Sequence, residues 1–148
     1  MNYFAYGSNM NYEHMRRLCG WHFNVLGVGT LRDYEFGPDH RGFANIHPKK
    51  GAHVIGVLYD IDQTALDTLD DFEGYPKVFD RKEVEIHDED GEKYKASVYM
   101  EDHGQFGGTY IKPEYLKRVI AGAIENRLPE GWVKFLRSFE VKSEGNGK

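Results

Sequence analysis

Two short segments of the sequence combine residue types that could hold a small molecule and move a proton. The first, Tyr6-Gly7-Ser8-Asn9, lies between a predicted strand and a predicted helix. A turn there would aim successive backbone N–H groups and the positive end of a helix at one point, which suits a carboxylate or a phosphate. Gly7 would let such a ligand approach the backbone closely. The pattern alone favours the alternative, an ordinary strand-ending turn, because Gly, Ser and Asn are common turn residues.

Stricter motifs for nucleophilic or phosphate chemistry are missing from the sequence. Ser8 lacks the flanking glycines of a Gly-x-Ser-x-Gly nucleophile elbow, and no Gly-x-x-x-x-Gly-Lys phosphate loop occurs. We therefore expect Ser8 to act as a hydrogen-bonding residue rather than as a nucleophile.

The second segment runs from Leu69 to Pro76, and its chemical interest lies in Glu73. Glu73 falls in the last turn of a predicted helix, near the negative end of the helix dipole and two aspartates, so its ionised form is disfavoured. A carboxyl group in that position, with aromatic neighbours, could have a raised pKa and exchange protons near neutral pH. The alternative is a solvent-exposed acidic helix end, which is the better interpretation of this pattern taken alone.

Tyrosines form a third set of candidates. Tyr6, Tyr99, Tyr110 and Tyr115 could line a cleft and supply hydroxyl groups, although tyrosines equally fill cores and sheet faces. Tyr115 follows Pro113 in the first turn of a predicted helix, and it is the tyrosine expected to reach a ligand.

The composition narrows the classes of function. The chain has 148 residues, of which 40% are hydrophobic, enough for one domain with its own core. Its 19 basic and 24 acidic residues give a net charge of −5, which argues against a nucleic-acid partner. Cys19 is the single cysteine and the histidines show no metal-ligand spacing, so no metal site is expected and a reducing compartment is indicated. With no basic leader and no apolar run near about 18 residues, we expect a cytoplasmic protein without a membrane partner.

The elements that must position these residues follow from hydrophobic periodicity and capping patterns. Asn11 and Asp62 are predicted helix N-caps, and Gly20 and Gly74 predicted helix ends. The predicted strands are 3–6, 23–36, 42–46, 54–61, 82–86 and 97–100, and the predicted helices are 11–20, 62–74, 113–126 and 132–136. This alternation predicts a mixed, mostly antiparallel α+β domain over residues 1–141, with a flexible tail at 142–148 and a loop at 104–108 that could serve as a lid.

Considered together, the two segments resemble a known family. Tyr3-Phe4-Ala5-Tyr6-Gly7-Ser8-Asn9-Met10 and Leu69-Asp70-Asp71-Phe72-Glu73-Gly74 look like the two signatures of the γ-glutamylcyclotransferase family, which includes the AIG2-like proteins. The likeness continues through Gly56–Tyr59, Pro113–Lys117 and Gly122–Pro129. The last of these segments is more similar to the enzyme that acts on free γ-glutamyl amino acids than to the glutathione-specific branch.

The resemblance implies a small β-barrel flanked by helices, and a reaction in which a γ-glutamyl amide closes on itself to give 5-oxoproline and a free amine. No cofactor is implied, and the chain would act as a monomer or homodimer. Glu73 matches the family's general acid/base, and Tyr115 matches a ligand-contacting tyrosine. Phe79 stands where the family often has a tyrosine, so one hydroxyl is lost. The substrate-holding loop matches Tyr3, Phe4, Ala5, Tyr6, Gly7, Ser8 and Asn9.

Two questions stay open at the level of sequence. The leaving group could be an amino acid, a γ-glutamylamine, an ε-lysyl amine or a γ-glutamyl-capped antibiotic intermediate, because the signatures concern the glutamyl half. Outside the enzyme class, the chain could be a binding module that senses 5-oxoproline or a related carboxylate without turning it over.

Overall fold

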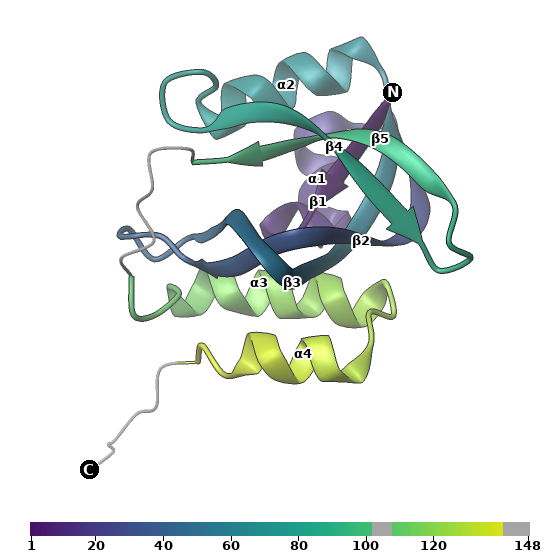
Figure 1. The fold of residues 1–148 in the computed structure, drawn as a ribbon. Helices are drawn as coiled ribbons and strands as arrows, with labels where there is room; N and C mark the ends of the chain where they lie inside the picture. The colour runs from purple at the N-terminus through teal and green to yellow at the C-terminus, as the bar shows by residue number, and fades with distance from the viewer. Residues whose placement is uncertain (102–107, 141–148) are drawn as a thin grey trace.

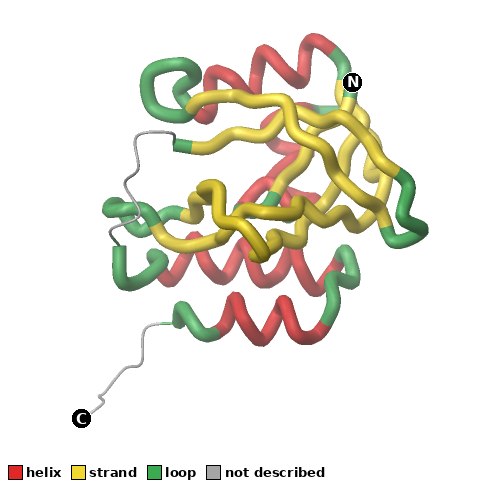
Figure 2. Tube along the Cα trace, in the orientation of Figure 1, coloured by secondary structure: helices red, strands yellow, loops and turns green. Residues whose placement is uncertain are grey.

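A computed structural model of the protein describes residues 1–101 and 108–140. The predicted loop at 104–108, apart from Gly108, and the predicted domain end and tail at 141–148 lie outside these residues. Figures 1 and 2 show the strands gathered between helices that lie on opposite sides. In chain order the elements are β1 (Asn2–Ala5), the 3₁₀ helix η1 (Ser8–Met10), α1 (Tyr12–Cys19), β2 (Phe23–Pro38), β3 (Ala44–Ile61), α2 (Gln63–Glu73), β4 (Asp80–Asp88), β5 (Lys93–Met100), α3 (Pro113–Glu125) and α4 (Glu130–Arg137).

The strands close into a barrel in the order β1-β3-β2-β4-β5. Neighbouring strands pair antiparallel, except that β1 and β5 run parallel and meet at Tyr3 and Ser97. Helices α3 and α4 lie next to each other on one side of the barrel, and α2 lies on the opposite side (Figure 1). The expected α+β fold, a small and mostly antiparallel barrel flanked by helices, is confirmed.

The predicted break between strands 42–46 and 54–61 is wrong, because both belong to the single strand β3. Pro48 and Gly51 lie between the two predicted strands, and β3 stays paired with β2 on both sides of them. A bulge absorbs the irregularity: the register shifts beside Asp33, and the Gly51 N–H donates to Asp33 Oδ1 at 2.9 Å. Both residues have positive φ angles, +63° at Asp33 and +86° at Gly51, so the strand bends without ending.

The helix boundaries follow the predicted caps. Asn11 accepts a hydrogen bond from the His14 N–H at 2.9 Å, and Asp62 accepts one from the Ala65 N–H at 3.0 Å. Gly74 ends α2 with a φ of +71°, a conformation that favours glycine. The last helix starts two residues earlier than predicted, at Glu130. Among the described residues, no helix is long and apolar enough to cross a membrane.

The interior of the barrel is filled by large side chains that need glycine opposite them. Phe4 is fully buried, and a Cβ atom placed on Gly56 would lie 2.9 Å from its ring and 2.2 Å from the Ala5 carbonyl oxygen. Gly56 therefore allows β3 to pass close to β1, and this packing fixes the start of the segment that follows β1.

Helix α3 approaches the turn after β1 at Gly122. A Cβ atom on Gly122 would lie 2.6 Å from the Asn11 nitrogen and 2.6 Å from the Met10 carbonyl carbon. At the end of the same helix, Asn126 Nδ2 donates to the Met10 carbonyl oxygen at 2.8 Å. Helix α3 is thus held directly against η1, and its first turn is held near the same segment.

Candidate active site

A cavity of about 350 Å³ lies where η1, the C-terminal end of α2 and the first turn of α3 come together with the end of β1. Its wall combines aromatic, polar and charged side chains. The lining residues are Tyr3, Phe4, Tyr6, Gly7, Ser8, Asn9, Arg41, Phe43, Ala44, Phe72, Glu73, Gly74, Val78, Phe79, Tyr99, Tyr115 and Arg118.

The structure brings most of the sequence-predicted site residues to this cavity. The predicted loop contributes every member except Ala5, which is 2% exposed and pairs with Val57 in the sheet. Glu73 and Tyr115 line the cavity as well. Tyr110, considered as a cleft residue, is 47% exposed and does not contribute to the lining.

The turn after β1 differs from the predicted cradle in one respect. The sequence predicts a strand, a turn and a helix in that order, and in the structure residues of the predicted turn form the 3₁₀ helix η1 just before α1. Asn11 and the first turn of α1 line a separate hollow, so it is the N-terminus of η1, at Ser8, and not that of α1 that borders this cavity. Within the turn, the N–H groups of Met10 and Asn11 already donate to the carbonyls of Gly7 and Ser8, each at 3.1 Å.

Tyr115 holds this turn from the side of α3. A Cβ atom on Gly7 would lie 2.6 Å from the Tyr115 hydroxyl oxygen, so glycine is required for the contact. Polar groups of the Ser8 and Ala44 backbone and the Ser8 side chain favour the ionised form of this hydroxyl and so oppose a rise in its pKa. Burial and the negative charge of Glu73 raise the pKa of Tyr115 well above its ordinary value, so it remains a neutral hydroxyl group.

Glu73 is connected to the same turn through Asn9. Asn9 Nδ2 donates to Glu73 Oε2 at 3.2 Å and to the Tyr3 hydroxyl oxygen at 2.8 Å. Burial raises the pKa of Glu73 from 4.5 to about 7, although the bond from Asn9 and the positive charge of Arg41 oppose the rise. A carboxyl group with that pKa both accepts and returns a proton near neutral pH.

The cause of this shift differs from the expected one. The sequence placed Glu73 among aspartates at a helix end, yet the dominant cause is the removal of water from the carboxyl group. Asp70 is engaged elsewhere, since it accepts a hydrogen bond from the Tyr99 hydroxyl at 2.6 Å and pairs with Arg81. Glu73 is therefore part of the cavity wall rather than a solvent-exposed helix end, which excludes the alternative considered from sequence.

Further tyrosine hydroxyls fix the backbone around the cavity. Tyr6 donates to the Tyr99 carbonyl oxygen at 2.6 Å, and Tyr59 donates to the Asn9 carbonyl oxygen at 2.7 Å. The rings of Tyr3 and Tyr99 pack edge to face with centroids 5.7 Å apart. These contacts join η1, β3 and β5, so the positions of Asn9 and Glu73 are set by the core of the barrel.

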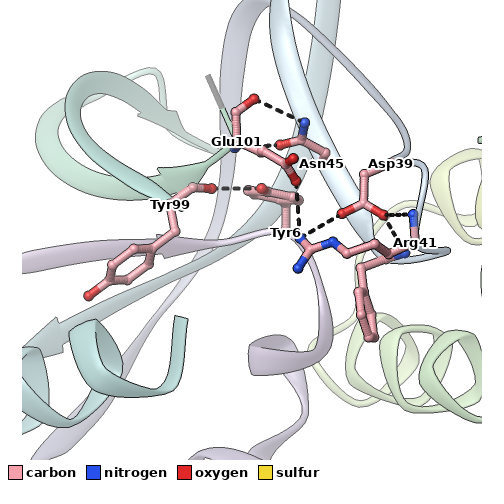
Figure 3. Close-up of polar contacts among 7 residues, drawn as sticks. Tyr6, Asp39, Arg41, Asn45, Tyr99 and Glu101 are labelled. Atoms are coloured by element: carbon pink, nitrogen blue, oxygen red, sulfur yellow. Dashed lines mark hydrogen bonds and ion pairs between the residues drawn. The ribbon is translucent and has the colours of Figure 1, made fainter. Parts of the chain in front are cut away.

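Arg41 is a charged wall residue that sequence reasoning did not find (Figure 3). Its Nη2 donates to Asp39 Oδ2 and to Glu101 Oε2, both at 3.0 Å. Asn45 anchors Glu101 in turn, because its Oδ1 accepts from the Glu101 N–H at 2.9 Å. Glu101 lies 60 residues from Arg41 in the chain, so no local pattern indicates this pairing. Arg118, which also lines the cavity, carries no local signal either.

The described residues offer no obvious metal centre. Within 1–101 and 108–140, no group of three or more His, Cys, Asp or Glu side chains is arranged to hold an ion.

Comparison with known proteins relates this geometry to a family. The model of the family described as gamma-glutamyl cyclotransferase, AIG2-like, matches residues 3–117. Gamma-glutamylcyclotransferases from Homo sapiens and Bos taurus are 29% and 30% identical to the chain, over 93% of its length and 78% of theirs. A solved gamma-glutamyl cyclotransferase structure superposes with a TM-score of 0.87 at 24% identity, covering 97% of this chain and 89% of that one. An uncharacterised human protein superposes with a TM-score of 0.86 at 26% identity, covering 99% and 91%.

Proposed function

The chain belongs to the AIG2-like γ-glutamyl cyclotransferase family, and we propose that it converts a γ-glutamyl amino acid or amine into 5-oxoproline and the free amine, with Glu73 as the general acid/base. The observation that carries this proposal is the desolvated carboxyl group of Glu73, which lies in the cavity wall with a pKa of about 7.

The reaction requires two protons to leave the α-ammonium group of the substrate and one proton to reach the leaving nitrogen. The α-amine of the substrate is the nucleophile, and at neutral pH it is largely an ammonium ion without a free electron pair. The ionised Glu73 removes a proton from it, the nitrogen attacks the γ-carbonyl carbon, and a five-membered ring forms. The attacking nitrogen then gives up a second proton to solvent, because the ring nitrogen of 5-oxoproline carries a single hydrogen. The bond from the γ-carbon to the leaving nitrogen breaks as Glu73 returns the first proton to that nitrogen, which leaves as the free amine. Atoms and charge then balance, and Glu73 is again ionised.

The turn after β1 supports this chemistry by holding the glutamyl half of the substrate. Gly7 and Ser8 line the cavity, and the absence of a side chain at Gly7 allows the Tyr115 hydroxyl to lie against their backbone. We propose that this backbone binds the α-carboxylate of the substrate and folds the glutamyl chain so that its amine faces its own carbonyl. Positioning of this kind accounts for a large part of the barrier reduction in intramolecular reactions.

The experiment that tests the proposal is a substrate panel. The purified protein is incubated with γ-glutamyl amino acids, a γ-glutamylamine and ε-(γ-glutamyl)lysine, and 5-oxoproline is measured by mass spectrometry. We expect product from at least one γ-glutamyl compound and none from matched α-glutamyl dipeptides, which cannot form the same ring. Binding of 5-oxoproline without product from any compound would instead support the non-catalytic binding module.

The pKa of Glu73 predicts the acid side of the pH profile. The general base must be ionised, so kcat/KM is expected to rise about tenfold per pH unit below the pKa of about 7 and to level off above it. The measurement is kcat/KM between pH 5 and pH 8 with one good substrate from the panel. A flat profile between pH 5.5 and pH 7.5 would show that Glu73 does not act as the base.

A further inference from the structure

Three charged residues line the cavity: Glu73, Arg41 and Arg118. Glu73 is assigned to proton transfer, and its pKa of about 7 leaves it largely neutral at slightly acid pH. The remaining charges on the wall are both positive. A substrate held by its α-carboxylate at the turn therefore shares the cavity with two cationic side chains. The proposed reaction gives neither of them a role.

The Arg41 guanidinium is held rigidly on that wall. Its Nη2 is fixed by Asp39, which is fully buried, and by Glu101, which is 9% exposed. Its Cζ lies 5.5 Å from the centre of the Phe43 ring and 5.6 Å from that of Phe79. Two carboxylates and two aromatic rings thus restrict the side chain, so little conformational entropy remains to be lost when a ligand binds.

The fixed guanidinium retains unused hydrogen-bonding capacity. An arginine side chain has five N–H donors, and both described side-chain bonds of Arg41 use Nη2. Nε is buried without a partner, and Nη1 has no hydrogen bond among the described residues. Figure 3 shows this second terminal nitrogen directed away from Asp39 and Glu101. A ligand oxygen at Nη1 would satisfy a donor that the protein leaves open.

The two carboxylates do not cancel the effect of Arg41 on the cavity. Neither Asp39 nor Glu101 belongs to the lining. Asp39 also shares its charge with the backbone, because its Oδ1 accepts from the N–H groups of Arg41 at 2.8 Å and Phe43 at 3.0 Å. The charged group that faces the cavity is therefore the Arg41 guanidinium, and Asp39 and Glu101 orient it from outside the cavity.

We propose that Arg41 is a specificity-determining residue that binds a carboxylate on the leaving half of the substrate. This proposal rests on the proposed function. Leaving groups that carry a carboxylate, such as amino acids, are then preferred over amines that lack one. Arg118 is less suited to this role, because its side chain is exposed on α3 and no described contact fixes it.

The test compares two substrates that differ in one charge, γ-glutamyl-alanine and γ-glutamyl-alaninamide. The wild-type protein is expected to favour the acid over the amide by about tenfold to hundredfold in kcat/KM, the range of one charge-assisted hydrogen-bond pair. In the R41K variant, which keeps the charge but loses the fork of N–H donors, the ratio is expected to fall to about threefold. The ratio is the readout, since damage to the fold lowers both rates together.

R118K is the matched control, because it makes the same exchange at the other arginine of the wall; it is expected to keep the wild-type ratio. Thermal unfolding shows whether both variants are folded, including R41K, in which the pairs of residue 41 with Asp39 and Glu101 are altered. Three results would overturn the proposal: equal use of both substrates by the wild type, an unchanged ratio in folded R41K, or loss of the ratio in R118K. Absence of 5-oxoproline from every γ-glutamyl compound of the panel, these two included, would overturn the proposed function itself.

Discussion

Replacement of Glu73 by Gln is expected to lower the rate of 5-oxoproline formation by about 10³- to 10⁴-fold, at the upper end of what a positioned general acid/base contributes. The amide has nearly the same size and keeps one oxygen facing Asn9 Nδ2, so the cavity retains its shape. It cannot take the proton from the substrate ammonium or return it to the leaving nitrogen. Single-turnover measurements with the best substrate of the panel give the rate, and calorimetric titration with 5-oxoproline shows that binding is retained.

The stability of the same variant provides an independent check on the state of Glu73. Its pKa is about 7 in the folded protein against 4.5 ordinarily, so the native state keeps a proton that the unfolded chain releases. The wild type therefore loses stability as pH rises from about 4.5 to about 7 and then stays level. E73Q has no such titrating group and lacks this loss. The difference in the free energy of unfolding, E73Q minus wild type, should therefore increase by about 2–3 kcal/mol from pH 4.5 to pH 8. Parallel curves for the two proteins would show that Glu73 is not desolvated, and an active E73Q would remove it from the mechanism.

Replacement of Gly122 by Ala is expected to destabilise the protein by about 1–3 kcal/mol, although alanine is the better helix former. The added methyl group would lie 2.6 Å from backbone atoms of Met10 and Asn11, which are not free to move like the end of a side chain. Helix α3 and η1 must then separate, and the contact of Tyr115 with the turn is displaced. Because small misplacements of positioning groups are costly, activity should fall by about tenfold to hundredfold. Urea unfolding and kcat/KM measure the two effects.

Gly131 offers a matched control for this substitution. It also lies in a helix, α4, but an added Cβ atom meets nothing within 4 Å. Gly131→Ala should therefore leave activity unchanged and raise stability by about 0.5 kcal/mol through helix propensity alone. If both alanine variants behave alike, the close approach of α3 to η1 does not determine the geometry of the site.

Local signals predicted a large part of the fold. The caps at Asn11 and Asp62 and the stop at Gly74 involve neighbours within four residues, so the sequence contains them in full. The turn of the hairpin between β4 and β5 is local in the same sense, because it depends on Gly91, which has a φ of +84°. The continuity of β3 was missed because the bulge at Gly51 depends on Asp33, which lies in a different strand.

The part of the candidate site that could be predicted is the part formed by two continuous sequence motifs. These motifs indicated the turn and Glu73. The hydrogen bond from Asn9 to Glu73 connects the two motifs across 64 residues. The role of burial in the pKa of Glu73 could not be predicted, because desolvation depends on the whole wall of the cavity. Arg41 was missed because its orientation also depends on a distant residue: it is fixed in part by Glu101, which lies 60 residues later in the chain.

The contacts that hold the turn after β1 also determine when the site can exist during folding. One of them joins Tyr6 to Tyr99 across 93 residues, and another joins Asn126 to Met10 across 116 residues. Such distant contacts carry a large loop-closure cost and form after the local hairpin and helices. A chain emerging from the ribosome would have its turn motif first, but the cavity would stay incomplete until α3 had been synthesised and docked. Catalytic competence is thus one of the last properties that the folding chain acquires.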